Sequence, residues 1–224
     1  MSTWPAFVQW NVRWLPSIAS IGTIGYLFVW RAHRFRRLYG KSPIKRPAPG
    51  DQSVHAFVSR MLMAFFGAIL SVALFAGVFP NQLEVVDPWY VWRSPGLLVA
   101  GTASMLVAFL VVLKGQNDMA TSWRVGVDED ERTELITGGI YRFCRNPIYL
   151  GLQLWMAGFV FVIPGLLTLA LFTTAGLLFQ IQARLEEAYL LSKHGEAHAR
   201  YCLEVGRFLP WTGRWLPHSA APVA

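Results

Sequence analysis

The stretch that most constrains the fold runs from Ile148 to Ala183, because it contains no charged side chain. Pro164-Gly165 interrupts it near the middle, where a turn is expected. Each half approaches the roughly 20 apolar residues that a helix needs to cross a bilayer. We therefore predict a membrane hairpin with helices at residues 148–163 and 165–183, the first of them short enough to tilt or to thin the bilayer locally.

Three more uncharged stretches are long enough to span a membrane, at residues 14–30, 61–79 and 95–113. Hydrophobic residues make up 54% of the chain and charged residues 15%, against about 25% charged in ordinary soluble domains. The sequence therefore predicts one all-α membrane domain over residues 1–224, with five transmembrane helices of which the last two form the hairpin.

The distribution of basic residues predicts the orientation. The loop between the first and second spans contains Arg31, Arg34, Arg36, Arg37, Lys41, Lys45 and Arg46, and Arg60 directly precedes the second span. Only Arg93 lies between the second and third spans. An excess of Lys and Arg marks a cytoplasmic loop, so we expect the N-terminus outside and the C-terminus in the cytoplasm. We expect no cleavable signal peptide, and the short loops suit a bacterial inner membrane.

The net charge of +7 comes from 20 basic and 13 acidic residues. Because the basic residues gather at the ends of apolar segments, the charge favours anionic lipid headgroups as partners, and we expect no nucleic acid. The two cysteines, Cys144 and Cys202, fall on the predicted cytoplasmic side and are expected to be free thiols. The five histidines are expected on the surface, and the acidic run from Asp128 to Glu134 is expected to be solvated, with no metal site.

Polar residues lie directly against both ends of the hairpin. The first group runs from Gly139 to Gly151, and the second begins at Arg184 and includes the adjacent Glu186 and Glu187. Such a cluster at the mouth of a membrane hairpin is costly unless it binds something. Adjacent residues on a helix point to different sides, so we expect one glutamate to face inward and the other to face water.

These polar groups supply an ordered series of short motifs. The series is Ser122-Trp123-Arg124, Gly139-Ile140-Tyr141-Arg142, Arg145-Asn146-Pro147-Ile148-Tyr149-Leu150-Gly151, Glu186-Glu187-Ala188-Tyr189-Leu190, Tyr201, and Arg207-Phe208-Leu209-Pro210. Their order around a membrane hairpin resembles the integral-membrane methyltransferases that include isoprenylcysteine carboxyl methyltransferase and phospholipid N-methyltransferases. The resemblance covers residues 122–210, roughly the C-terminal half. The first two spans resemble no family that we can name.

The resemblance implies a methyltransferase that binds S-adenosylmethionine at the cytoplasmic face, in a pocket capped by loops and the C-terminal tail. The methyl group would pass to a lipophilic acceptor that arrives from the bilayer. The implied cofactor-binding residues are Tyr141, Arg145, Asn146, Pro147, Tyr149, Leu150, Gly151, Glu186, Glu187, Tyr201 and Arg207, and among them we predict catalytic roles for Arg145, Glu187 and Arg207. Asn146 stands where the family more commonly has His. An amide can still bind the cofactor by hydrogen bonds, but it cannot act as a proton acceptor.

The residue types suit this cofactor. An arginine pairs with a carboxylate through two N–H donors, which suits Arg145 or Arg207. Glutamate accepts from an ammonium or from ribose hydroxyls, and aromatic faces attract a sulfonium. The first amides of the helix at 148–163 can bind anions, and Gly151 allows close approach of a ligand or of a neighbouring helix. Methyl transfer chiefly requires alignment of the acceptor and exclusion of water, without a metal.

Two other functions remain open from the sequence. One is a membrane reductase that uses NADPH, because steroid 5α-reductases are similar in this C-terminal region. The other is a non-enzymatic transporter, assembly factor or scaffold. The acceptor also remains open among prenylcysteine carboxylates, phospholipid amines, isoprenoids and hydrophobic or small volatile thiols, and so does the oligomeric state.

Overall fold

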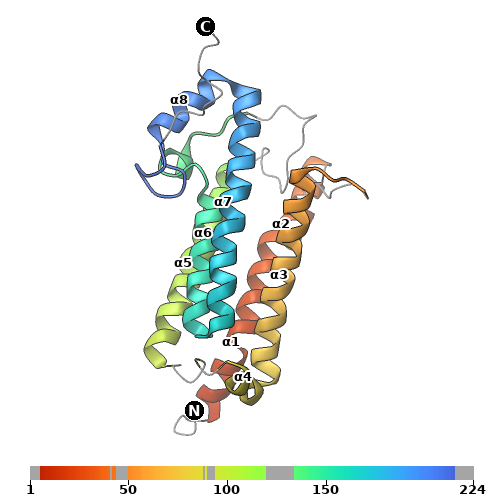
Figure 1. The fold of residues 1–224 in the computed structure, drawn as a ribbon, viewed down its shortest axis with the longest axis vertical. Helices are drawn as coiled ribbons and strands as arrows, with labels where there is room; N and C mark the ends of the chain where they lie inside the picture. The colour runs from red at the N-terminus through yellow and green to blue at the C-terminus, as the bar shows by residue number, and fades with distance from the viewer. Residues whose placement is uncertain are drawn as a thin grey trace.

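The described part of this computed structural model, residues 6–40, 42–43, 50–87, 89, 94–119 and 134–214, is built of helices with one isolated β-bridge. The Ser122-Trp123-Arg124 motif and the acidic run from Asp128 to Glu131 lie outside these residues. Figure 1 shows an elongated bundle in which α2, α8 and the C-terminal end of α7 lie toward one end, while α4 lies toward the other.

The chain begins with three helical segments that follow one another without a break. They are α1 (Ala6–Ile24), the π-helix η1 (Gly25–Trp30) and α2 (Arg31–Tyr39). Gly40 ends this rod in the left-handed conformation, with φ of 70°, that commonly terminates helices. The predicted span at 14–30 lies inside the rod, which continues beyond it at both ends.

Three helices then run through the middle of the sequence. The first is α3 (Val54–Val78), capped at its start by the Ser53 hydroxyl, which accepts from the Ala56 amide at 3.1 Å. It is followed by the short α4 (Pro80–Val86) and by α5 (Pro95–Met119). Both long helices contain the apolar stretches predicted to span the membrane.

The C-terminal half forms the predicted hairpin and a cap. A short 3-10 helix, η4 (Gly139–Arg142), precedes α6 (Pro147–Val162); then come α7 (Leu166–His194) and α8 (Glu196–Glu204). Because α7 continues well beyond the predicted end at residue 183, Glu186 and Glu187 lie on the same helix as the membrane segment. Within the described residues, three helices are long and apolar enough to cross a membrane (Val54–Val78, Pro95–Asp118 and Leu166–His194), and α6 is a shorter apolar helix. The count of five spans stays a prediction.

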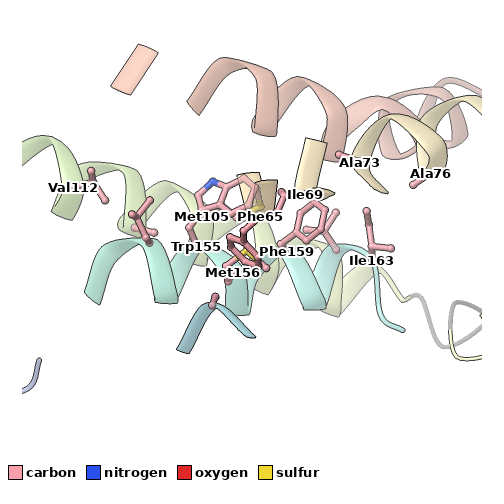
Figure 2. Close-up of a cluster of buried hydrophobic side chains, with 14 of the residues drawn as sticks. Phe65, Ile69, Ala73, Ala76, Met105, Val112, Trp155, Met156, Phe159 and Ile163 are labelled. Atoms are coloured by element: carbon pink, nitrogen blue, oxygen red, sulfur yellow. The ribbon is translucent and has the colours of Figure 1, made fainter. Parts of the chain in front are cut away.

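The core lies where α6 meets α3 and α5. Trp155 and Phe159 of α6 stack with their ring centroids 5.3 Å apart, and both are buried. Figure 2 shows these two rings, with Phe65 and Ile69 of α3 and Met105 of α5 in the same cluster. The N-terminal half is therefore packed against the hairpin through side chains from three helices.

Helices α5 and α6 approach each other along a seam of small residues. A Cβ added at Gly158 would lie 2.6 Å from the carbonyl oxygen of Gly101, and one added at Gly101 would lie 2.7 Å from that of Gly158. About two turns nearer the start of α6, a Cβ added at Gly151 would lie 2.6 Å from Cγ2 of Val112 on α5. Small residues let helix backbones come this close in membranes. The sequence left open whether Gly151 allows close approach of a ligand or of a neighbouring helix. The structure shows that it packs against helix α5.

The start of α7 is held by Asp87, which follows α4. Its buried carboxylate accepts from the Leu167 amide at 3.0 Å. A carboxylate at a helix N-terminus satisfies an otherwise unpaired amide and interacts favourably with the helix dipole. This contact ties the hairpin turn to the loop after α4, at the end of the molecule opposite α8 (Figure 1).

Candidate functional site

A single β-bridge brings together the two polar segments that flank the hairpin. Cys144 pairs in parallel with Gly206. The Arg145 amide donates to the Gly206 carbonyl at 2.9 Å, and the Asn146 amide donates to the Arg207 carbonyl at 3.1 Å. Pro147 is the first residue of α6 and keeps Asn146 out of the helical region, so the helix begins only after the bridge. Arg145 and Arg207 are therefore neighbours although 62 positions separate them in the sequence numbering.

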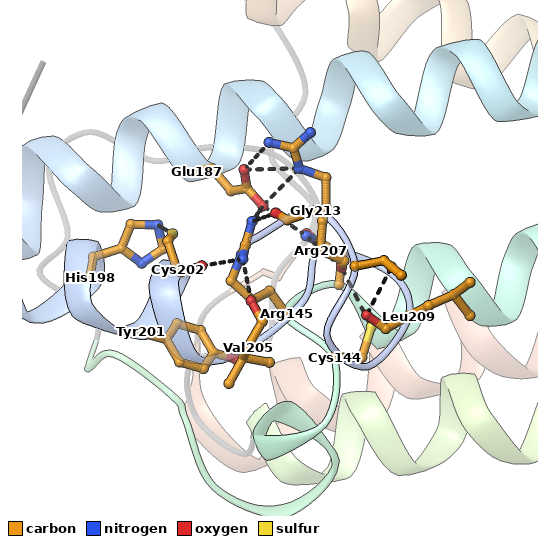
Figure 3. A network of polar contacts seen from close by, with 12 residues as sticks. Cys144, Arg145, Glu187, His198, Tyr201, Cys202, Val205, Arg207, Leu209 and Gly213 are labelled. Carbon is orange, nitrogen blue, oxygen red and sulfur yellow. Dashed lines mark hydrogen bonds and ion pairs between the residues drawn. The ribbon is translucent and has the colours of Figure 1, made fainter. Parts of the chain in front are cut away.

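Glu187 of α7 lies between these two arginines. Its carboxylate is 3.0 Å from Nη2 of Arg145 and 2.7 Å from Nη2 of Arg207. All three side chains are buried, with exposed fractions of 6% for Arg145, 6% for Glu187 and 8% for Arg207. Figure 3 shows them pointing toward one another from three separate segments. The three predicted catalytic residues thus form one buried ion-pair cluster.

Arg145 uses all three of its guanidinium nitrogens in contacts with the protein. Nε and Nη2 donate to Oε1 of Glu187 at 3.1 and 3.0 Å. Nη1 donates to the carbonyls of Cys202, at 3.0 Å, and Val205, and Nη2 also donates to the carbonyl of Gly213 at 3.3 Å. The two carbonyls bound by Nη1 lie at the C-terminal end of α8, where a cation is favourable. Arg145 therefore clamps α7, α8 and the C-terminal turn together.

Asn146 completes the set around Glu187. Its Nδ2 donates to Oε1 of Glu187 and to the Arg207 carbonyl, both at 3.3 Å. The buried amide therefore supports the same cluster that its neighbour Arg145 forms. A neutral amide suits this position because Glu187 already faces two positive charges, and a third cation beside them would be repelled.

A second polar cluster lies between α6 and α7. The Tyr149 hydroxyl donates to Oε1 of Glu186 at 2.5 Å, and Nε2 of Gln182 donates to the same oxygen at 3.0 Å. The Tyr149 ring stacks on Phe179 with centroids 5.6 Å apart. Of the two adjacent glutamates, Glu187 faces inward as expected, whereas Glu186 is only half-exposed to water because it is bonded to Tyr149 of α6.

Sequence reasoning missed Gln182. It lies one helical turn before Glu186, a spacing that places both on one face of α7 and that was available as a signal. Its side chain is buried, and its Oε1 has no hydrogen-bond partner among the described residues. A buried acceptor without a donor is costly, so this position favours a ligand that brings an N–H or O–H group.

Tyr201 and Tyr141 join the cap to the end of α5. The Tyr201 hydroxyl donates to the Tyr141 carbonyl at 2.6 Å, and the Tyr141 hydroxyl reaches the Gly115 carbonyl at 3.4 Å. Burial raises the pKa of both phenols, so they remain neutral donors at physiological pH. Both predicted residues therefore act here as ties between helices.

The remaining predicted residues lie in the first turns of α6. Pro147 is buried, and Leu150 is half-buried with its amide already donating to the Asn146 carbonyl at 3.0 Å. The Leu150 amide is therefore bonded within the helix. Of the amides that we expected to bind an anion, those of Ile148 and Tyr149 precede it in the helix. Gly151 faces α5, as described above.

The two thiols of the site, Cys144 and Cys202, are buried. Cys144 forms the β-bridge with Gly206, and Sγ of Cys202 lies 3.5 Å from Nε2 of His198. Burial raises the pKa of Cys144 to about 11 and also raises that of Cys202. A thiol is a nucleophile only as the thiolate, so neither is poised for attack. Within the described ranges, no three His, Cys, Asp or Glu side chains are grouped to hold a metal ion.

His198 corrects the expectation that all histidines lie on the surface. It is 1% exposed on α8, against the cluster formed by Arg145 and Glu187. Burial lowers its pKa from 6.5 to about 4, although the nearby Glu187 carboxylate opposes this shift. The surface expectation failed because His198 lies one turn before Cys202, on the face of α8 that packs inward.

This shift predicts a loss of stability in mild acid. The folded state keeps His198 neutral, whereas the unfolded state takes up a proton below about pH 6.5, so stability falls as the pH decreases from 6.5 toward 4. Between pH 7.5 and 5.5 we expect His198 to contribute a loss of roughly 1 kcal/mol. Thermal unfolding of the wild type and of His198→Asn at both pH values checks this. An equal acid-induced drop in melting temperature in the two proteins would contradict it.

Comparison with known proteins agrees with this architecture. Residues 97–197 match the phospholipid methyltransferase family model. The resemblance to integral-membrane methyltransferases is thereby confirmed for this segment, which contains most of α5, all of η4, α6 and α7, and both Arg145 and Glu187. Tyr201 and Arg207 lie beyond it, so their place in the site rests on the geometry. No curated protein sequence is significantly similar to the chain.

The fold is also similar to that of a solved structure. That structure is of a eukaryotic intramembrane Ras methyltransferase, isoprenylcysteine carboxyl methyltransferase. The sequences are 17% identical, the TM-score is 0.55, and the match covers 92% of this chain and 75% of the other. Because the match covers 92% of this chain, the likeness in fold extends beyond residues 97–197 to the N-terminal helices.

Proposed function

We propose that this protein is an integral-membrane methyltransferase that transfers a methyl group from S-adenosylmethionine to a lipophilic acceptor, at the predicted cytoplasmic end of α6 and α7. The observation that carries the proposal is the convergence of Arg145, Glu187 and Arg207 from three separate motifs into one buried cluster. The family match over residues 97–197 and the shared fold support the same reaction class.

The polar groups between α6 and α7 fit the methyl donor. Glu186 and Oε1 of Gln182, for which the described residues supply no donor, are acceptors that suit the ammonium or ribose hydroxyls of S-adenosylmethionine. Tyr149 offers a hydroxyl and an aromatic face beside them. When bound, the cofactor would supply a methyl group on a sulfonium sulfur, and the neutral thioether that remains is a good leaving group. The protein's part is to orient both reactants and to exclude water.

The contacts of the ion-pair cluster suggest how its three members contribute. The Glu187 oxygens already accept from Arg145, Asn146 and Arg207, so the carboxylate is poorly placed to take up a proton. Arg145 is likewise engaged on every nitrogen. We propose that these residues hold the wall of the site in place and set its positive potential. Direct contact of Arg207 or Glu187 with the reactants stays a prediction.

This arrangement suits an acceptor that needs little help in losing a proton. The lone pair of the acceptor forms the new bond to carbon while the carbon–sulfur bond breaks. A carboxylate acceptor has no proton to lose, whereas an amine or thiol must lose one to water or to a nearby base. Carboxylates, lipid amines and hydrophobic thiols remain the candidates, and mass spectrometry of a lipid extract incubated with isotopically labelled methyl donor identifies which of them gains the label.

Calorimetric titration of the purified protein with S-adenosylhomocysteine tests cofactor binding. We expect S-adenosylhomocysteine to bind and S-adenosylmethionine to compete with it. Tyr149→Phe should weaken the affinity by about 3- to 10-fold, which corresponds to the loss of one hydrogen bond. Tyr189→Phe is the matched control, because Tyr189 lies on the same helix as Glu186 and contacts Lys193 through its ring face. If S-adenosylhomocysteine gave no heat of binding and NADPH bound tightly, the proposal of a methyltransferase would be wrong and a reductase would be favoured.

A further inference from the structure

The helix α2 carries a dense basic surface that the methyl-transfer site does not use. Four of its nine residues are arginines, and a histidine accompanies them. Arg34, Arg36 and Arg37 are exposed, and among the described residues no carboxylate forms a salt bridge with them. The first 50 residues of the chain contain no Asp or Glu at all. Within the part of the chain that the structure describes, this surface is therefore positive and no carboxylate is paired with its exposed arginines.

The continuous rod of η1 and α2 also carries aromatic residues on both sides of these arginines, Tyr26 and Trp30 on η1 and Phe35 and Tyr39 on α2. The Arg34 guanidinium lies 5.5 Å from the ring centroid of Trp30, one turn back toward the apolar segment. Trp30 in turn stacks on Tyr26 at 4.8 Å. At the far end Tyr39 is exposed and packs against Phe35 at 4.6 Å. Such rings prefer the headgroup layer, so the arginines between them lie at that depth.

The connection to the membrane segment determines which anionic partner can reach this surface. The rod from α1 through η1 to α2 is continuous, and η1 exposes Val29 immediately before the arginines. A helix that leaves the hydrocarbon layer without a break places its first two turns among lipid phosphates. A nucleic acid or soluble anionic protein would have to displace those lipids first. The end of η1 is held in place because Arg31 donates to Asn117 of α5 at 2.7 Å.

We propose that α2 is a binding surface for anionic phospholipid headgroups, with Arg34, Arg36 and Arg37 as the residues that contact the phosphates. Arginine binds phosphate through paired N–H donors, and clusters of basic residues directly beside a transmembrane helix attract anionic lipid. The surface lies toward the same end of the molecule as α8 (Figure 1). It selects lipid by charge and is independent of the proposed methyl transfer.

Native mass spectrometry of the full chain, released from neutral detergent in the presence of equal amounts of phosphatidylglycerol and phosphatidylcholine, tests this proposal. We expect the wild type to retain phosphatidylglycerol in preference. The triple variant Arg34→Gln, Arg36→Gln and Arg37→Gln should lose that preference by about tenfold or more, because each cation contributes to the attraction. The corresponding Lys triple variant should keep most of the preference, since the charge remains.

A second triple variant provides the matched control. Arg184→Gln, Lys193→Gln and Arg200→Gln removes the same charge from exposed positions of α7 and α8. This variant should keep most of the lipid preference. Two outcomes would overturn the proposal: no preference in the wild type, or an equal loss in both Gln triple variants, which would indicate attraction by net charge alone. Unchanged circular dichroism and melting temperature show that each variant is folded, since Gln and Arg have similar helix propensities.

Discussion

Replacing Glu187 with Ala is expected to destabilise the protein by about 3–5 kcal/mol, because it leaves two buried arginines without their carboxylate. Arg145 and Arg207 together place five N–H contacts on this side chain. For a chain of this length the loss corresponds to a fall in melting temperature of roughly 10 °C. Thermal unfolding in neutral detergent, followed by circular dichroism, measures it.

Glu186→Ala is the internal control for this prediction. Glu186 is adjacent on α7 but half-buried, and it bonds to neutral Tyr149 and Gln182, so its loss should cost less. The double variant Arg145→Ala, Glu187→Ala should be more stable than the sum of the two single effects predicts, since the pair is removed together. Strictly additive effects, or equal losses of stability for the two glutamate variants, would show that the ion-pair cluster does not stabilise the fold.

Replacing Gly158 with Leu is expected to cost about 3 kcal/mol, because the added side chain has no space between α5 and α6. Its Cβ alone would lie 2.6 Å from the Gly101 carbonyl oxygen and 2.7 Å from Cγ of Met105. Relief requires the two helix backbones to separate where they are closest. A large fall in melting temperature, with a smaller fall for Gly158→Ala, is the expected result.

Gly67→Leu separates this packing effect from the properties of glycine in a helix. Gly67 lies in the middle of α3, is exposed, and has no atom within 4 Å of an added Cβ. Leu there should be neutral or stabilising, because Leu favours the helix more than Gly does. If Gly67→Leu and Gly158→Leu changed stability alike, close packing of α5 on α6 would not be the cause.

Local features of the sequence were sufficient for much of the architecture. Hydropathy located the apolar helices, since burial in lipid depends on composition over about 20 residues. Pro164-Gly165 marked the hairpin turn, and Pro147 marked the start of α6, because proline restricts the backbone of its own and the preceding residue. The order of the polar motifs indicated the fold that the solved methyltransferase shares.

Other features of the site depend on contacts between distant segments. The sequence offered Arg145 as a free anion ligand, whereas the fold surrounds it with acceptors from α7, α8 and the C-terminal turn. It left Gln182 unnoticed and His198 on the surface. Whether a polar side chain is buried depends on which helix covers it, and no local pattern encodes that.

The chain's own order of apolar and polar residues determined that it forms helices, where they turn and which motifs flank the hairpin, because these properties arise from backbone geometry and hydropathy over short distances. Only the tertiary structure decided that Glu187 faces two arginines, that Glu186 bonds to Tyr149 across the hairpin, and that Gly151 serves helix packing. Those outcomes depend on how helices come together in space, where a shift of one turn would give each side chain a different partner.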